Sequence, residues 1–141
     1  MIDSYFIHLL ILIGIYLILG ISLQLSLGYG GLLNLGHIAF FGIGAYAFAL
    51  LSLHGFPFVL SILVSSIISG LFGWLLSVPT NKLKGDYLAL VTLGFSFVVY
   101  AVLLNWTSIT GGAFGLANIP RPSFLSDNFS FLLFVYAIAV I

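Results

Sequence analysis

The stretch GYGGLLNLGHIAFFGIGAYAF, Gly28 to Phe48, decides the fold expected for this chain. It is apolar enough to lie inside a membrane, yet it carries a glycine cluster at Gly28, Gly30 and Gly31. Glycine lets neighbouring backbones approach closely, and it weakens a helix wherever several glycines lie together. A helix that only faces lipid has no need of such a cluster. The stretch therefore indicates a discontinuous helix that lines a path or packs against a partner.

The composition places the whole chain in a membrane. Of its 141 residues, 62% are hydrophobic and 4% are charged, whereas about 25% are charged in a soluble domain. Three Lys or Arg and three Asp or Glu side chains cannot form a water-exposed surface. Long apolar runs separated by polar turns predict an all-α, polytopic transmembrane helix bundle, because barrel strands would alternate polar and apolar residues.

We expect about four full spans and an incomplete fifth, in a single transmembrane domain over residues 1–141. In the second span, the glycines allow the helix to be discontinuous. The full spans are predicted at Tyr5–Leu23, Leu32–Leu53, Phe58–Val78 and Tyr87–Asn105. The last apolar run, Phe129–Ile141, has thirteen residues and is too short to cross a bilayer. The chain is therefore expected to stop inside a helix.

The few charges suggest an orientation. Lys82 and Lys84 lie in the polar loop at residues 79–86, which the positive-inside rule places in the cytoplasm. The loop at residues 107–128 is then outside. Four simple spans put the N-terminus outside as well, but a broken or re-entrant glycine-rich stretch reverses that count, so both N-terminal orientations stay open.

Small residues in the third predicted span indicate a packing surface. Ser65, Ser66, Ser69 and Gly70 follow one another closely in this span. Small side chains let helix backbones approach in lipid, and hydroxyls can bond backbone carbonyls across the contact. We expect these four residues to form the face on which a neighbouring helix packs.

Polar and small residues of the glycine-rich stretch are the candidates for a solute path. Asn34 and His37 are three residues apart, so on a continuous helix they would share one face. His37 either bonds a neighbouring carbonyl as a structural group or lies near a solute route or gate. The candidate substrate path consists of Gly28, Gly30, Gly31, Asn34, His37, Gly42 and Gly44.

Two further motifs flank the fourth span. Gly85 and Asp86 precede it, and Asp86 is well placed as an N-cap or as a first-turn acid that interacts favourably with the helix dipole. After the span come Thr110, Gly111 and Gly112. This second motif is either a plain extracellular turn or a flexible element beside a solute path, and both interpretations stay open.

The sequence offers little for catalysis. It has no cysteine and no glutamate, and His8, His37 and His54 lie in separate segments with no spacing typical of a metal site. Phosphate-binding loops and the common hydrolase motifs are absent. We therefore predict no catalytic residue, no metal and no cofactor in this chain. The absence of a basic patch also argues against nucleic-acid binding.

Three blocks of sequence resemble a known family. They are GYGGLLNLGHIAFFGIGAYAFALL (Gly28–Leu51), KLKGDYLALVTLGF (Lys82–Phe95) and LLNWTSITGGAFGLANIP (Leu103–Pro120). In this order and at this approximate spacing, they are similar to the LivM-like permease subunits of branched-chain amino-acid ABC importers. The resemblance covers most of the chain and implies the N-terminal half of such a subunit.

The resemblance implies a function and a set of partners. A periplasmic solute-binding protein would deliver leucine, isoleucine or valine to a membrane path formed by this chain and a second, LivH-like permease subunit. Two cytoplasmic ATPase subunits would use ATP to drive alternating access. The chain would then be a multi-pass protein of the bacterial plasma (inner) membrane, in contact with the lipid bilayer.

One departure from the family pattern limits the comparison. Family members often carry a Glu and an Arg after the GDYLA block, where this chain has Phe97 and Tyr100. Any role of that charged pair is therefore not transferred. The alternatives are a permease for another small solute (urea, an amide or a sugar), a non-transporting membrane scaffold, and an intramembrane enzyme that would need a catalytic pair.

Overall fold

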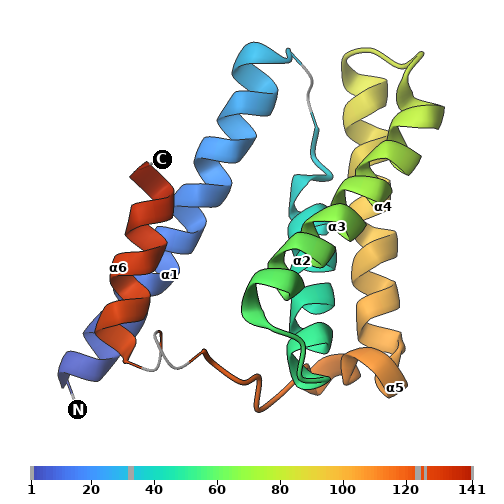
Figure 1. Cartoon of the computed structure of the whole chain (residues 1–141). Helices are drawn as coiled ribbons and strands as arrows, with labels where there is room; N and C mark the ends of the chain where they lie inside the picture. The colour runs from blue at the N-terminus through green and yellow to red at the C-terminus, as the bar shows by residue number, and fades with distance from the viewer. Residues whose placement is uncertain (1, 32–33, 123–124, 126, 141) are drawn as a thin grey trace. The chain divides into compact units, whose positions relative to one another are not determined.

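The computed structural model describes residues 2–31, 34–122, 125 and 127–140, and every regular element among them is a helix (Figure 1). This confirms the predicted all-helical class. The chain divides into two compact units. The first combines Met1–Gly30 with Arg121–Ile141, and the second is Gly31–Pro120.

The first unit is a pair of helices that come from opposite ends of the sequence. Helix α1 (Ile2–Gln24) continues directly into a π-helical turn, η1 (Leu25–Tyr29), and pairs with α6 (Asn128–Val140). Figure 1 shows α6 lying along α1. No proline interrupts these apolar runs, so each can form its backbone hydrogen bonds internally, as lipid requires.

Close packing of small and branched residues joins α1 to α6. Ile11 of α1 and Val135 of α6 are each only 5% exposed. Gly14 lies three residues after Ile11, and an added Cβ there would come within 2.7 Å of Val135 Cγ1. The Tyr136 hydroxyl also donates a 3.3 Å hydrogen bond to the carbonyl of Leu10. Gly14 therefore sets how closely the two helices approach.

The second unit is a group of three helices followed by two short helical turns, α5 and η2, which we call the corner. In this unit, α2 packs against α3 and α4, and α4 contacts the corner. Its elements are α2 (His37–Leu53), α3 (Phe58–Thr80), α4 (Asp86–Asn105), the single turn α5 (Thr107–Thr110) and the 3₁₀ turn η2 (Gly112–Phe114).

Three segments of the described chain are long and apolar enough to cross a membrane, namely Ser4–Tyr29, α3 and α4. They correspond to the first, third and fourth predicted spans. Helix α2 has only 17 residues and α6 has 13. At about 1.5 Å per residue, α2 is about 25 Å long, slightly less than the roughly 30 Å hydrocarbon layer. The predicted start of the second span was therefore too early.

The packing face of α3 differs in part from the prediction. Ser61 and Ser65 are buried, at 0% and 6% exposure, and Ser69 donates a 2.9 Å hydrogen bond to the carbonyl of Phe40 on α2. These three serines recur every four residues and so share one side of the helix. Ser66 and Gly70 lie one position further round and are exposed. Ser66 and Gly70 therefore take no part in the packing between α3 and α2 seen here, so their predicted packing role stays a prediction, and that of Ser61 was missed.

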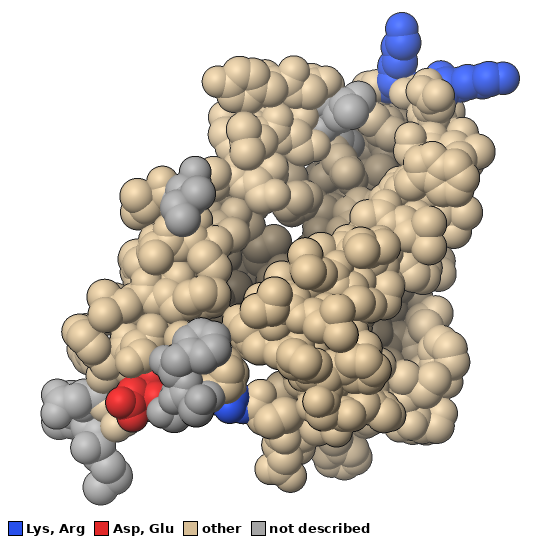
Figure 2. All heavy atoms as spheres, viewed as in Figure 1, with Lys and Arg blue, Asp and Glu red and all other residues tan. Residues whose placement is uncertain are grey.

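Charged side chains are confined to the ends and loops of the helices. Lys82 and Lys84 are exposed in the turn between α3 and α4. Figure 2 shows blue side chains protruding where this turn lies, while the face of the helices seen in this view is mostly tan, that is, without Lys, Arg, Asp or Glu. An uncharged surface on the helices is what a lipid environment requires.

Candidate functional site

The glycine-rich stretch is interrupted between η1 and α2. Tyr29 ends the π-helical turn, Gly31 has a positive φ of 60°, and α2 does not begin until His37. Residues 32–33 lie outside the described chain, and residues 34–36 are not helical. A non-helical link thus follows the glycine cluster and separates η1 from α2, at a point where glycine weakens helical structure. That this link, called the break below, interrupts a membrane helix stays a prediction.

Asn34 takes part in a local turn rather than in a helix face. Its side-chain oxygen Oδ1 accepts a 2.9 Å hydrogen bond from the backbone N–H of Gly36, as Asn commonly does in turns. The prediction that Asn34 and His37 share one helical face was therefore wrong, because α2 begins after Asn34.

Two hydroxyls of α4 hold the segment that precedes α2. The Leu35 N–H donates a 3.0 Å hydrogen bond to Thr92 Oγ1, and Ser96 Oγ donates to the Leu35 carbonyl at 3.1 Å. Thr92 is only 2% exposed, and its hydroxyl in turn donates within its own helix. Both backbone groups of a non-helical residue are thus satisfied by α4, as an apolar environment demands.

Gly36 lets the backbone come close enough for these bonds. An added Cβ would lie 3.1 Å from the carbonyl oxygen of Thr92 and 3.3 Å from Thr92 Cβ. One turn further on, the rings of Phe40 and Phe95 are 5.4 Å apart and extend the contact between α2 and α4. Sequence reasoning missed Thr92, Ser96 and Gly36, although two hydroxyl residues four apart on an apolar helix are a recognisable signal.

His37 is the first residue of α2 and is half-buried. Within the described residues its ring makes no hydrogen bond, so neither the structural role nor the role near a solute route is established. Its position directly after the break nevertheless leaves its imidazole as a polar group without a partner there.

Gly42 and Gly44 face different neighbours. A Cβ on Gly42 would lie 3.7 Å from Leu103 of α4, and a Cβ on Gly44 would lie 3.6 Å from Ser69 Cβ of α3. Both glycines therefore lie at helix contacts, where even a Cβ would touch the neighbouring helix. Gly28 and Gly30 lie at the opposite side of the break, in and just after η1.

The two motifs that flank α4 take defined conformations. Gly85 occupies the N-cap position with φ 59°, and Asp86 is the first residue of the helix. Asp86 is therefore the predicted first-turn acid, whereas its alternative assignment as N-cap was wrong. No side-chain hydrogen bond caps this end of the helix, so Asp86 acts through the helix dipole.

Thr110, Gly111 and Gly112 form a closed corner after α4. Thr110 Oγ1 lies 2.6 Å from the carbonyl of Leu103 and accepts from the N–H of Gly112 at 3.3 Å. Gly111 has φ 74°, and an added Cβ there would overlap the carbonyl oxygen of Gly115. The corner thus requires glycine at this position.

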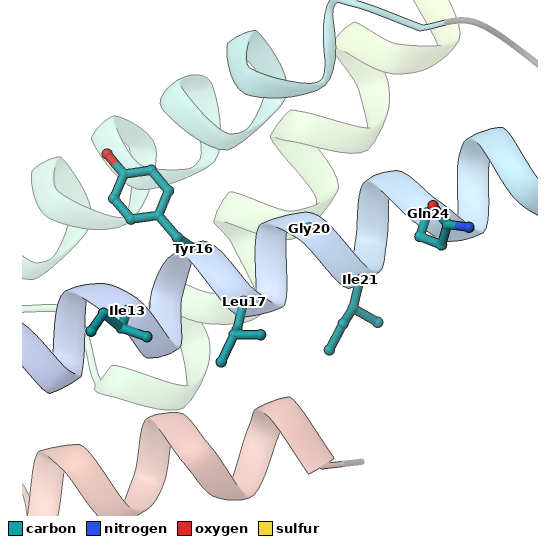
Figure 3. A pocket seen from close by; sticks show the side chains of 6 residues that line it. All are labelled: Ile13, Tyr16, Leu17, Gly20, Ile21 and Gln24. Atoms are coloured by element: carbon teal, nitrogen blue, oxygen red, sulfur yellow. The ribbon is translucent and has the colours of Figure 1, made fainter.

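Helix α1 carries a shallow hollow on its surface. Figure 3 shows that every lining residue comes from this one helix, with Leu17 and Ile21 projecting from the same side. The lining residues are Ile13, Tyr16, Leu17, Gly20, Ile21 and Gln24. Ligand sites usually bring together polar groups from several elements, and this hollow does not. Among the described residues, no group of three His, Cys, Asp or Glu could hold a metal.

These features define a class: a multi-pass membrane protein whose described elements are all helical, with a non-helical link before the packed group of α2, α3 and α4. The chain belongs to the family of permease components of branched-chain amino acid transport systems, whose family model matches residues 5–141. The family indicated by the three sequence blocks is thus confirmed.

Two relatives give the same result. The chain is 43% identical over 77 residues to the high-affinity branched-chain amino acid transport system permease protein LivM of Salmonella typhimurium (strain LT2). It is 42% identical over 77 residues to the LivM protein of Escherichia coli (strain K12). Each match covers 55% of this chain but only 18% of the relative. No solved structure matches the chain.

Proposed function

We propose that this chain is the membrane-spanning permease component of an ABC importer for the branched-chain amino acids leucine, isoleucine and valine. The observation that carries the proposal is the family match over residues 5–141. The names of the two LivM relatives, which cite high-affinity branched-chain amino acid transport, point to the same solutes. The helical segments long enough to span a bilayer fit a permease.

The break before α2 is the proposed centre of the solute path. Backbone that leaves a helix at membrane depth is tolerated only where protein or a cavity surrounds it, and transporters bind solutes at such breaks. Apolar walls with a few polar groups suit a zwitterion with an aliphatic side chain. The proposed path residues are Gly28, Gly30, Gly31, Asn34, His37, Gly42 and Gly44.

The proposed mechanism is alternating access driven from outside this chain. A second, LivH-like permease subunit would complete the path, and a periplasmic binding protein would deliver the solute. Two cytoplasmic ATPase subunits would bind and hydrolyse ATP, so the chain itself would need no cofactor. The complex would lie in the bacterial inner membrane, with Gly85–Asp86 at the start of α4 and Thr110–Gly112 in the turns that follow it.

Uptake by the assembled importer tests the function. The permease chain that carries this sequence is expressed with its partner subunits in cells that lack their own branched-chain amino acid importers. We expect saturable, ATP-dependent uptake of labelled leucine, isoleucine or valine. Uptake of urea, an amide or a sugar instead would assign another solute. A correctly assembled complex that transports none of these would leave the scaffold role and overturn the proposal.

Gly44→Leu tests the proposed path. A Cβ there would already be in van der Waals contact with Ser69 at 3.6 Å, so the further carbons of leucine would crowd the contact between α2 and α3. We expect uptake to be lost while membrane insertion is kept. Gly70→Leu is the matched control, since no atom lies within 4 Å of a Cβ built on Gly70. Normal uptake by a fully assembled Gly44→Leu complex would count against the path.

A further inference from the structure

Leu35 is held by side chains rather than by helical hydrogen bonds. Its N–H donates to Thr92 Oγ1 at 3.0 Å, and its carbonyl accepts from Ser96 Oγ at 3.1 Å. Thr92 and Ser96 are four residues apart, and therefore lie on the same face of α4. These two bonds, which we call the hydroxyl clamp, bind both backbone groups of one residue just before α2 begins.

Comparison with a second threonine isolates what is special about Thr92. Thr80 on α3 is also buried, at 8% exposure, and its hydroxyl donates to the carbonyls of Leu76 and Ser77 in its own helix. Thr92 makes the same kind of bonds to Leu88 and Ala89. Thr92 additionally accepts the N–H of another segment, 57 residues away in the sequence.

Ser66 provides the corresponding comparison for Ser96. Ser66 Oγ donates to the carbonyl of Ile62, four residues earlier in its own helix. Ser96 Oγ lies 3.2 Å from the corresponding carbonyl of Thr92, but also 3.1 Å from the Leu35 carbonyl. The hydroxyl has a single hydrogen, so it serves these two acceptors in turn or shares the hydrogen between them.

We propose that Thr92 and Ser96 are positioning residues for transport. The hydroxyl clamp fixes where α2 starts on α4, and so holds Asn34 and His37 at the break of the proposed path. Gly36 completes the clamp by allowing the close approach to the Thr92 backbone. The effect on uptake rests on the proposed function, whereas the clamp itself is testable without transport.

The first experiment measures hydrogen–deuterium exchange at the Leu35 amide in the assembled complex. Thr92→Val keeps the side-chain shape but removes the acceptor, which leaves the Leu35 N–H unpaired. We expect exchange to become about tenfold faster or more, because an unpaired amide loses its protection. Thr80→Val should change the same rate less than about twofold, and Thr92→Ser should keep the parent rate. Equal Leu35 exchange in Thr92→Val and the parent complex would overturn the clamp.

The second experiment measures uptake per assembled complex. The partner binding protein captures the solute, so we expect Thr92→Val and Ser96→Ala to lower the maximal rate about fivefold or more. The half-saturating concentration should change less than about twofold. Thr92→Ser should restore the rate, and Thr80→Val and Ser66→Ala should not lower it. A purely structural defect would instead reduce the amount of complex and leave the rate per complex unchanged.

The exchange and uptake experiments together separate the proposed function from the proposed positioning role of Thr92 and Ser96. If the parent takes up no branched-chain amino acid, the proposed function and the role of Thr92 in uptake both fail, and the exchange arm alone decides the clamp. If exchange at Leu35 accelerates while the uptake rate stays normal, the clamp exists but Thr92 and Ser96 are not positioning residues for transport.

Discussion

In the unit formed by α1 and α6, the helices meet through apolar contacts such as that of Gly14 with Val135. In the unit of α2, α3 and α4, hydroxyl groups such as those of Thr92 and Ser69 join one segment to another. The difference follows from the backbone. Unbroken helices in lipid satisfy their own polar groups, whereas a broken one must find partners elsewhere.

The comparison also shows two uses of glycine. Gly14 serves van der Waals contact between two regular helices, which is the main attraction between helices in lipid. Gly36 and Gly111 serve irregular backbone: a Cβ on Gly111 would overlap the main chain of Gly115, and one on Gly36 would lie tightly against the Thr92 carbonyl. Substitutions should therefore be more damaging in the second unit than in the first.

The largest effect is expected for Gly111→Val in the corner after α4. The positive φ of Gly111 and the overlap of any Cβ with Gly115 cannot be relieved by a side-chain rotation. We expect a loss of about 3 kcal/mol or more in the free energy of unfolding, measured by denaturant titration in detergent. Gly70→Val is the control and should cost far less. Equal stability of the two variants would contradict the rigid corner.

An intermediate effect is expected for Gly14→Ala in the first unit. The new methyl group would lie 2.7 Å from Val135 Cγ1, and overpacking of this kind costs about 1–3 kcal/mol. Adding Val135→Ala should recover much of the loss, which a double-mutant cycle measures. Gly20→Ala has open space and serves as the control. Additive losses in the double variant would show that α1 and α6 do not meet here.

The smallest effects should distinguish the hydrogen bonds of the two units. Ser69→Ala removes the 2.9 Å bond to Phe40, and we expect a cost of about 1 kcal/mol. Tyr136→Phe removes the 3.3 Å bond to Leu10 and should cost about 0.5 kcal/mol or less. Unfolding of both variants under identical detergent conditions provides the comparison. A larger loss of stability for Tyr136→Phe than for Ser69→Ala would contradict the expected difference between the two units.

Much of the helix pattern was predictable from local sequence. The predicted third span, Phe58–Val78, differs from α3 by two residues at its end, and the predicted fourth, Tyr87–Asn105, differs from α4 by one residue at its start. The Gly and Pro residues at positions 55 and 57 mark the turn between α2 and α3. These features depend on hydropathy and turn chemistry, which neighbouring residues determine.

The candidate site was only partly predictable. The glycine cluster indicated the break, but the start of α2 was placed at Leu32 rather than at His37. The roles of Thr92 and Ser96 went unnoticed: their spacing of four residues marks a shared polar face on α4, but the sequence does not say which segment that face binds. Whether the proposed path residues bind a solute stays a prediction.

By itself, the sequence determined that this is a helical membrane protein of the branched-chain amino acid permease family, because composition and motif order record those properties directly. Only the tertiary structure decided where α2 begins and which small residues face which helix. The physical reason is distance along the chain: Leu35 is held by residues 57 and 61 positions away. Such bonds form only once α2 and α4 have packed together, so a local pattern can mark the hydroxyls but cannot identify their partner.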